Sequence, residues 1–231
     1  MESSANYQQT IDVETEFALI KEDKQVKKVE GQVPFFTKFK IFDVSLKARA
    51  FKEDLMFATN KNYRETIRRG LSYLQEENGR ITILRRGLQK FFDVKQEYFD
   101  VIDGTAELDQ LKIKQVEKDL YHVIFDEVLT VLDNGGKVVV YKTEKANGEN
   151  AQVTYNPILD AWVCASKNVA ITIRNADDLE AYRQLKESRY SFAILIAETW
   201  LKLLKKVKNH DDLKKDLTGK AIIGEYCGKF L

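Results

Sequence analysis

The chain has 231 residues, of which 37 are Lys or Arg and 36 are Asp or Glu, giving a formal net charge of +1. A hydrophobic fraction of 44% beside a charged fraction of 32% is typical of a globular protein and excludes a disordered one. No apolar run approaches the roughly 18–20 residues that span a bilayer, and the first residues lack the layout of a secretory signal. With two cysteines and two histidines, neither a disulfide framework nor a His-rich metal site is expected. We therefore expect an intracellular protein in a reducing compartment, the cytoplasm or the nucleus.

The first part of the chain differs in texture from the rest. Residues 1–34 are polar and charge-rich, and we expect a loosely held N-terminal arm before a main domain over residues 35–231. Asn78–Gly79 predicts a hairpin turn that leads into a strand ending near Arg85. Further β-branched runs predict strands over residues 137–141, 151–155, 161–165 and 169–173.

Two segments have helical periodicity. Apolar residues recur at the spacing of a buried helix face from Ala176 to Lys208, and less regularly from Glu107 to Leu132, where Gly135–Gly136 would end the helix. Together with the strands, this predicts an α+β fold of mostly antiparallel sheets with packed helices.

The segment from Thr143 to Asn150 has the composition of a reactive turn. Lys145 lies at the end of a predicted strand and is followed closely by Asn147–Gly148, where glycine lets the backbone approach a ligand. An amine held among cations or in a dry pocket loses part of its proton affinity and becomes a nucleophile. Asn-Gly is also a common hairpin signal, so an exposed turn is the alternative.

Lys145–Ala146–Asn147–Gly148 resembles the nucleophile motif, Lys-x-Asp/Asn-Gly, of covalent nucleotidyltransferases: RNA ligases, DNA ligases and mRNA capping enzymes. Four other segments resemble motifs of this superfamily in the same order. They are an Arg-Gly segment at 67–71, a second Arg-Gly with Lys-Phe-Phe at 85–92, a Ser-Lys motif at 164–167 and a Gly-Glu motif at 223–228. The first two resemble phage-type RNA ligases and fungal tRNA ligases. From Arg69 to Gly228 the chain therefore resembles the adenylyltransferase domain of an ATP-dependent RNA ligase.

The resemblance implies a role for each matching residue. Lys145 would attack the α-phosphate of ATP, release pyrophosphate and hold AMP as a lysyl-AMP intermediate. AMP would then pass to an RNA 5′-phosphate, and the end would be sealed to an RNA 3′-hydroxyl, in RNA repair or tRNA splicing. Arg69 and Lys90 match positions that hold ATP phosphates, and Lys167 matches one that contacts the nucleotide beside the reacting phosphate.

The remaining matches concern the nucleoside and the ligation step. Glu225 would accept hydrogen bonds from the ribose hydroxyls, and either Ile223 or Tyr226 would lie near the adenine. Glu144, Asn147 and Gly148 complete the nucleotide-binding motif around Lys145, and Asn150 serves ligation in the branch that carries Glu-Lys-x-x-Gly-x-Asn. Mg²⁺ is implied because the charge of a nucleoside triphosphate must be screened during transfer.

The chain departs from the family pattern in two places. The stretch between Phe92 and Lys145 is longer than in phage-type ligases, which predicts an insertion at residues 96–136. The chain ends at Leu231, before the Glu-Gly and Lys-x-Lys motifs that follow in the family. We therefore expect a nucleotidyltransferase (ATP-grasp-like ligase) core that is incomplete at its C-terminus, binds ATP and reacts weakly alone.

Two other functions agree with these motifs. One is a non-catalytic nucleotide- or RNA-binding module of the same fold, and the other is a GTP-using mRNA capping guanylyltransferase. The Arg-Gly and Lys-Phe-Phe segments favour a ligase over a capping enzyme. A run of lysines from Lys202 to Lys215 is either a solvated helix face or a path for an RNA backbone.

Overall fold

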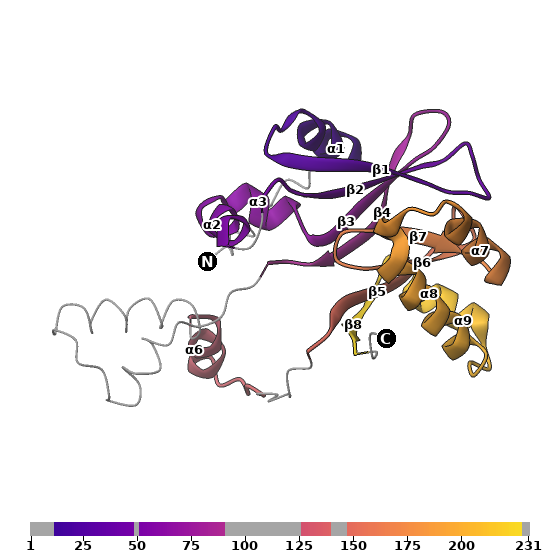
Figure 1. Cartoon of the computed structure of the whole chain (residues 1–231). Helices are drawn as coiled ribbons and strands as arrows, with labels where there is room; N and C mark the ends of the chain where they lie inside the picture. Colours follow the sequence, from indigo (N-terminus) through magenta and orange to yellow (C-terminus); the bar gives the residue numbers. More distant parts are fainter. Residues whose placement is uncertain (1–11, 49–50, 91–125, 140–146, 228–231) are drawn as a thin grey trace. The chain divides into compact units, whose positions relative to one another are not determined.

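The computed structural model describes residues 12–48, 51–90, 126–139 and 147–227 (Figure 1). The chain divides into two compact units, one formed by Met1–Lys90 with Ala146–Leu231 and the other by Phe91–Lys145. The predicted insertion at 96–136 falls within the second unit. Its described part holds helix α6 (Asp126–Asp133), which ends where predicted, because the amides of Gly135 and Gly136 bond back to Leu132 and Val131.

The first unit contains two antiparallel four-stranded sheets. Sheet A has the order β1-β2-β3-β4, and sheet B has the order β7-β6-β5-β8. The strands of sheet A are β1 (Val26–Gln32), β2 (Lys40–Leu46), β3 (Arg69–Gln75) and β4 (Ile81–Leu88). The predicted hairpin turn between β3 and β4 is confirmed: Gly79 has a φ of 87°, and the backbone amide of Glu76 donates to the carbonyl of Arg80.

Helices cover one face of sheet A. Helices α1 (Val13–Glu22) and α2 (Phe51–Thr59) bury Phe17 and Phe57 against strand residues such as Leu71, and the short helix α3 (Lys61–Thr66) leads into β3. The side chain of Asp12 caps α1 by accepting from the amide of Thr15. The prediction of a loosely held arm over residues 1–34 is therefore wrong from Asp12 onward, because amphipathic packing of α1 and pairing of β1 make this segment part of the fold.

Sheet B carries helices on its outer face. Its strands are β5 (Glu149–Asn156), β6 (Ala161–Ala165), β7 (Ala170–Ile173) and β8 (Ile222–Tyr226). Val153, Cys164 and Ile171 pack there against helix α8 (Ser191–Leu204), in particular against Trp200. The strands predicted at 151–155, 161–165 and 169–173 are confirmed. Of the strand predicted at 137–141, residues 137–139 are described, and they do not form a strand.

The helix predicted over Ala176–Lys208 is broken. Helix α7 (Ala176–Gln184) ends before Lys186, whose positive φ of 52° cannot continue a helix. A short 3₁₀ turn (Ser188–Tyr190, η2) then leads into α8, and helix α9 (His210–Leu217) follows separately. Apolar periodicity detects the buried face but not the interruption.

The inner faces of the two sheets pack together. Ile41, Leu74 and Leu84 of sheet A form one apolar cluster with Ala161 and Val163 of sheet B. The predicted α+β class with antiparallel sheets and packed helices is confirmed at this level. Among the described residues, no helix combines the length and the hydropathy needed to cross a membrane.

Candidate functional site

A line of polar side chains crosses the inner face of sheet A. Asp43 of β2 pairs with Ser72 of β3, which pairs with Arg85 of β4, so the three side chains share one face. The Ser72 hydroxyl donates to Asp43 over 2.7 Å, and Arg85 Nε donates to the Ser72 hydroxyl over 2.9 Å. Burial raises the pKa of the Asp43 carboxyl and lowers that of the Arg85 guanidinium to about 10, although each charge partly offsets the effect on the other. Burying charged groups such as these costs free energy, so the network stabilises the fold only when each of its groups keeps its hydrogen-bonding partners.

The network continues into sheet B through Gln152 of β5. Arg85 Nη1 donates to the side-chain oxygen of Gln152 over 3.2 Å and to the backbone carbonyl of Ser166 over 2.5 Å. The amide nitrogen of Gln152 donates to the carbonyl of Arg69 over 2.9 Å and to the side-chain oxygen of Asn150 over 2.7 Å. Gln152 thereby joins two predicted site residues, Arg69 and Asn150, from different sheets.

The glycines of both Arg-Gly segments leave room for Gln152. A Cβ at Gly70, where φ is +94°, would lie 2.3 Å from the Gln152 amide nitrogen. A Cβ at Gly87 would lie 2.0 Å from the Arg69 carbonyl and 2.7 Å from the same amide nitrogen. Sequence reasoning missed Gln152; the available signal was a glutamine two residues after Asn150, and therefore on the same face of the predicted strand.

The register between β5 and β8 sets the other side of the site. Asn150 pairs with Glu225 and Gln152 pairs with Ile223, so these four side chains share the inner face of sheet B. Tyr226 pairs with Glu149 instead, and it packs against the apolar cluster beneath α8. Of the two residues considered for the adenine, Ile223 lies on the face of Asn150 and Tyr226 lies on the opposite face.

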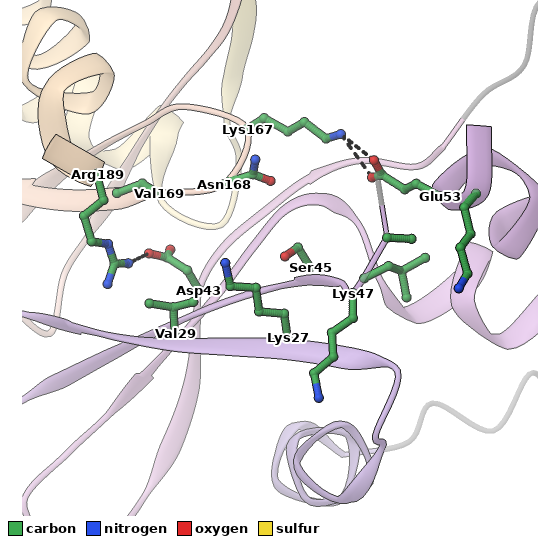
Figure 2. Close-up of a pocket in the computed structure, with 13 residues that line it drawn as sticks. Lys27, Val29, Asp43, Ser45, Lys47, Glu53, Lys167, Asn168, Val169 and Arg189 are labelled. Carbon is green, nitrogen blue, oxygen red and sulfur yellow. Dashed lines mark hydrogen bonds and ion pairs between the residues drawn. The ribbon is translucent and has the colours of Figure 1, made fainter. Parts of the chain in front are cut away.

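Two predicted site lysines that lie far apart in sequence, Lys90 and Lys167, both form ion pairs with carboxylates of helix α2. Lys167 Nζ lies 3.0 Å from both carboxylate oxygens of Glu53, and Lys90 Nζ lies 2.7 Å from Asp54. Figure 2 shows Lys167 extending from its loop toward Glu53. Since Glu53 and Asp54 are consecutive, the structure brings Lys90 and Lys167 to one short stretch of helix. An incoming phosphate would have to displace these carboxylates from the amines.

The nucleophile motif is described in part. Asn147 and Gly148 are exposed residues directly before β5, and a Cβ at Gly148 would lie 2.5 Å from the carbonyl of Tyr226. Glycine is thus required at position 148, because the backbone there passes too close to β8 to leave room for a Cβ atom. Glu144 and Lys145 lie outside the described residues.

Metal ligands are sparse in the described part of the chain, which contains no group of three or more His, Cys, Asp or Glu side chains placed to hold a metal ion. Mg²⁺ in phosphoryl-transfer sites is commonly held by one or two carboxylates together with substrate phosphates and waters. The carboxylates beside the two lysines, Glu53 and Asp54, are bound by those lysines, so a Mg²⁺ ion would have to enter with a nucleotide and bring phosphate and water ligands of its own.

Comparison with known proteins assigns no family: no family model matches the chain, and no curated protein or solved structure is significantly similar to it. Function is therefore inferred from the residues and the geometry above.

Proposed function

We propose that this chain is the nucleotidyltransferase domain of an ATP-dependent RNA ligase, which acts through a lysyl-AMP intermediate on Lys145. The observation that carries the proposal is the convergence of residues from separate motifs. Arg69 and Asn150 are joined through Gln152, and Asn150 pairs directly with Glu225. Residues that were singled out only by their resemblance to ligase motifs are thereby neighbours in the fold.

In the first step, the neutral amine of Lys145 attacks the α-phosphorus of ATP. A P–N bond forms, the P–O bond to the β-phosphate breaks, pyrophosphate leaves and the amine loses a proton to solvent. Negative charge that develops on the phosphate oxygens needs cations close by, a role for Arg69, Lys90 and Lys167. Mg²⁺, when bound, screens the charge of the triphosphate.

In the second step, an oxygen of the RNA 5′-phosphate attacks the phosphorus of the bound AMP. The P–N bond breaks, the Lys145 amine regains a proton, and the RNA carries AMP through a new pyrophosphate linkage. An RNA 3′-hydroxyl then attacks the 5′-phosphorus, loses its proton and releases AMP as the phosphodiester forms. Asn150, fixed by Gln152, is the residue proposed for this sealing stage.

The nucleoside is proposed to bind over the inner face of β8. Glu225 is exposed there and is a suitable acceptor for ribose hydroxyls, and Ile223 supplies an apolar surface on the same face. The register favours Ile223 over Tyr226 for the adenine contact. Glu144, Asn147 and Gly148 would border the nucleotide beside Lys145.

The proposal is tested by incubating the protein with Mg²⁺ and α-labelled ATP or α-labelled GTP, followed by denaturing electrophoresis. We expect label on the protein from ATP, chase of that label by 5′-phosphorylated RNA, and little label from GTP. Preferential labelling by GTP would indicate a capping guanylyltransferase. Nucleotide binding without covalent label would indicate the non-catalytic module and would overturn the ligase proposal.

A further inference from the structure

A basic cavity of about 700 Å³ lies at the edge of sheet A (Figure 2). Strands β1 and β2, helix α2, the β6–β7 loop and the η2 turn all contribute to its lining. The cationic residues among the described lining are Lys27, Lys47, Lys52, Lys167 and Arg189. Of these, only Lys167 belongs to the proposed nucleotide site.

The carboxylates that line the basic cavity, Asp43 and Glu53, are both already bound to cations. Asp43 is buried and lies 2.7 Å from Arg189, and it also accepts from Ser72. Glu53 binds Lys167 through both of its oxygens. The cavity therefore has no uncommitted carboxylate among its described residues to balance further positive charge.

Three lysines remain after these pairs. Lys27, Lys47 and Lys52 are exposed, and in the described structure their side-chain amines make no hydrogen bond or ion pair, although the backbone amide of Lys47 donates to the carbonyl of Gln25. Figure 2 shows the amine of Lys47 directed away from Lys167, so that Lys47 contributes mainly its stem to the lining. An excess of uncompensated positive charge in a concave site favours an anionic ligand.

The lining also indicates which part of an anionic ligand fits. Among the described lining residues there is no aromatic side chain, and the apolar contribution is limited to small or aliphatic residues such as Val29 and Leu46. A nucleobase would find no ring to stack on, whereas phosphates need only cations. The volume lies within the range of small-ligand sites, roughly 300–1,000 Å³, and exceeds what one phosphate group requires.

We infer that the basic cavity binds backbone phosphates of the RNA strand, independently of sequence. The RNA partner rests on the proposed function, and the cavity adjoins that site in two ways. Lys167 belongs to both, and Asp43 begins the polar network that reaches Gln152 and Asn150. RNA phosphates held here would place the strand beside the residues proposed for sealing.

A second basic surface provides a matched control. Lys202 and Lys205 line a separate cavity bordered by α7, α8 and α9. Other cations of that cavity are paired: Arg183 with Glu180, and Lys214 with Asp160. Replacing Lys202 and Lys205 removes the same charge as replacing two lysines of the basic cavity, and it also tests the alternative RNA path along the lysine run from Lys202 to Lys215, which we take to be a solvated helix face.

The experiment measures fluorescence anisotropy of a 3′-labelled, 5′-phosphorylated single-stranded RNA across a salt series. The proteins are the unaltered chain, Lys27→Gln/Lys52→Gln and Lys202→Gln/Lys205→Gln, each checked for folding by circular dichroism. For the first pair we expect about tenfold weaker binding at low salt. The slope of log K against log salt should fall by about 1.4 in magnitude, because each phosphate contact on a single strand contributes about 0.7. The control pair should leave the slope unchanged.

Equal losses in both pairs, or no loss in the first, would overturn the inference. If the Lys27→Gln/Lys52→Gln protein lost binding of labelled ATP but kept its RNA binding, the inference would also be overturned, since the cavity would then hold the nucleotide's own phosphates. Lysyl-AMP formation is measured on the same proteins. If the unaltered chain forms no lysyl-AMP, the ligase proposal fails, while the RNA comparison still decides whether the basic cavity binds RNA.

Discussion

The side-chain amide of Gln152 donates a hydrogen bond to the backbone carbonyl of Arg69 over 2.9 Å, between residues 83 positions apart. This contact joins the first residue of β3 in sheet A to β5 in sheet B. Gln152 is 2% exposed, and its remaining amide bond is to Asn150. The positions of Arg69 and Asn150 relative to each other therefore depend on one buried side chain.

Replacing Gln152 with Ala should destabilise the fold by about 1–3 kcal/mol, because the Arg69 carbonyl and the Arg85 guanidinium each lose one hydrogen-bond partner. Urea denaturation measures this change. Gln184, exposed near the end of α7, is the matched control, and its change to Ala should stay within about 0.5 kcal/mol. Equal effects of the two substitutions would show that the Gln152 contacts contribute little.

Alanine substitutions at Gly70 and Gly79 distinguish the free-energy cost of backbone strain from the cost of a steric clash. Both glycines have positive φ, +94° and +87°, but a Cβ at Gly79 meets nothing within 4 Å, whereas one at Gly70 meets Gln152. Gly79→Ala should cost about 1–2 kcal/mol from strain alone, and Gly70→Ala should cost about 1–3 kcal/mol more. Thermal or urea unfolding of both variants gives the difference.

A double variant tests the cause of that difference. Shortening Gln152 to Ala in the Gly70→Ala background removes the conflicting atoms, so the two substitutions together should cost less than the sum of their separate effects. Strict additivity would mean that the amide of Gln152 does not determine the requirement for glycine.

Arg85 is buried with only 1% of its side chain exposed, so Arg85→Met should leave the Asp43 carboxylate and Gln152 short of a partner. Breaking a buried charge network in this way costs about 3–5 kcal/mol. Arg183→Met, which removes an exposed arginine paired with Glu180, should cost less than about 1 kcal/mol. Chemical denaturation at neutral pH checks both values, and a stable, cooperative Arg85→Met protein would contradict the network's structural role.

The two cysteines should differ in reactivity. Cys164 is fully buried beneath α8, and burial raises the pKa of its thiol, so the reactive thiolate is both scarce and inaccessible. Cys227 is exposed after β8. A thiol-reactive chromophore should modify one cysteine in the native protein and two after denaturation. Native Cys227→Ser protein should not react, and rapid reaction of that variant would show that the core around Cys164 is open.

The local structure could be predicted from the sequence where the residue types or the apolar spacing of a segment suit one element. The β-branched runs at 151–155, 161–165 and 169–173 predicted β5, β6 and β7, and the spacing around Trp200 predicted the buried face of α8. The break at Lys186 was missed because a single positive φ leaves no mark on apolar periodicity.

The site could be predicted only as separate motifs. Whether Ile223 or Tyr226 shares the face of Asn150 is decided by the register between β5 and β8, a pairing of distant segments that local patterns do not encode. Gln152 was missed for the same reason, since its structural role consists of contacts with β3 and β4 of the other sheet. The carboxylate partners of Lys90 and Lys167 on α2 likewise depend on tertiary packing.

The most direct test of the proposed lysyl-AMP chemistry is intact-mass spectrometry after incubation with ATP and Mg²⁺, followed by peptide mapping. Lys145→Ala is compared with Lys215→Ala, a substitution of an exposed lysine on α9. Because the chain is expected to react weakly alone, we expect a fraction of the unaltered and Lys215→Ala proteins to gain the mass of one AMP, located on Lys145, and no increase in Lys145→Ala. An unmodified native chain, or an AMP adduct that persists in Lys145→Ala, would contradict the assignment of Lys145 as the nucleophile.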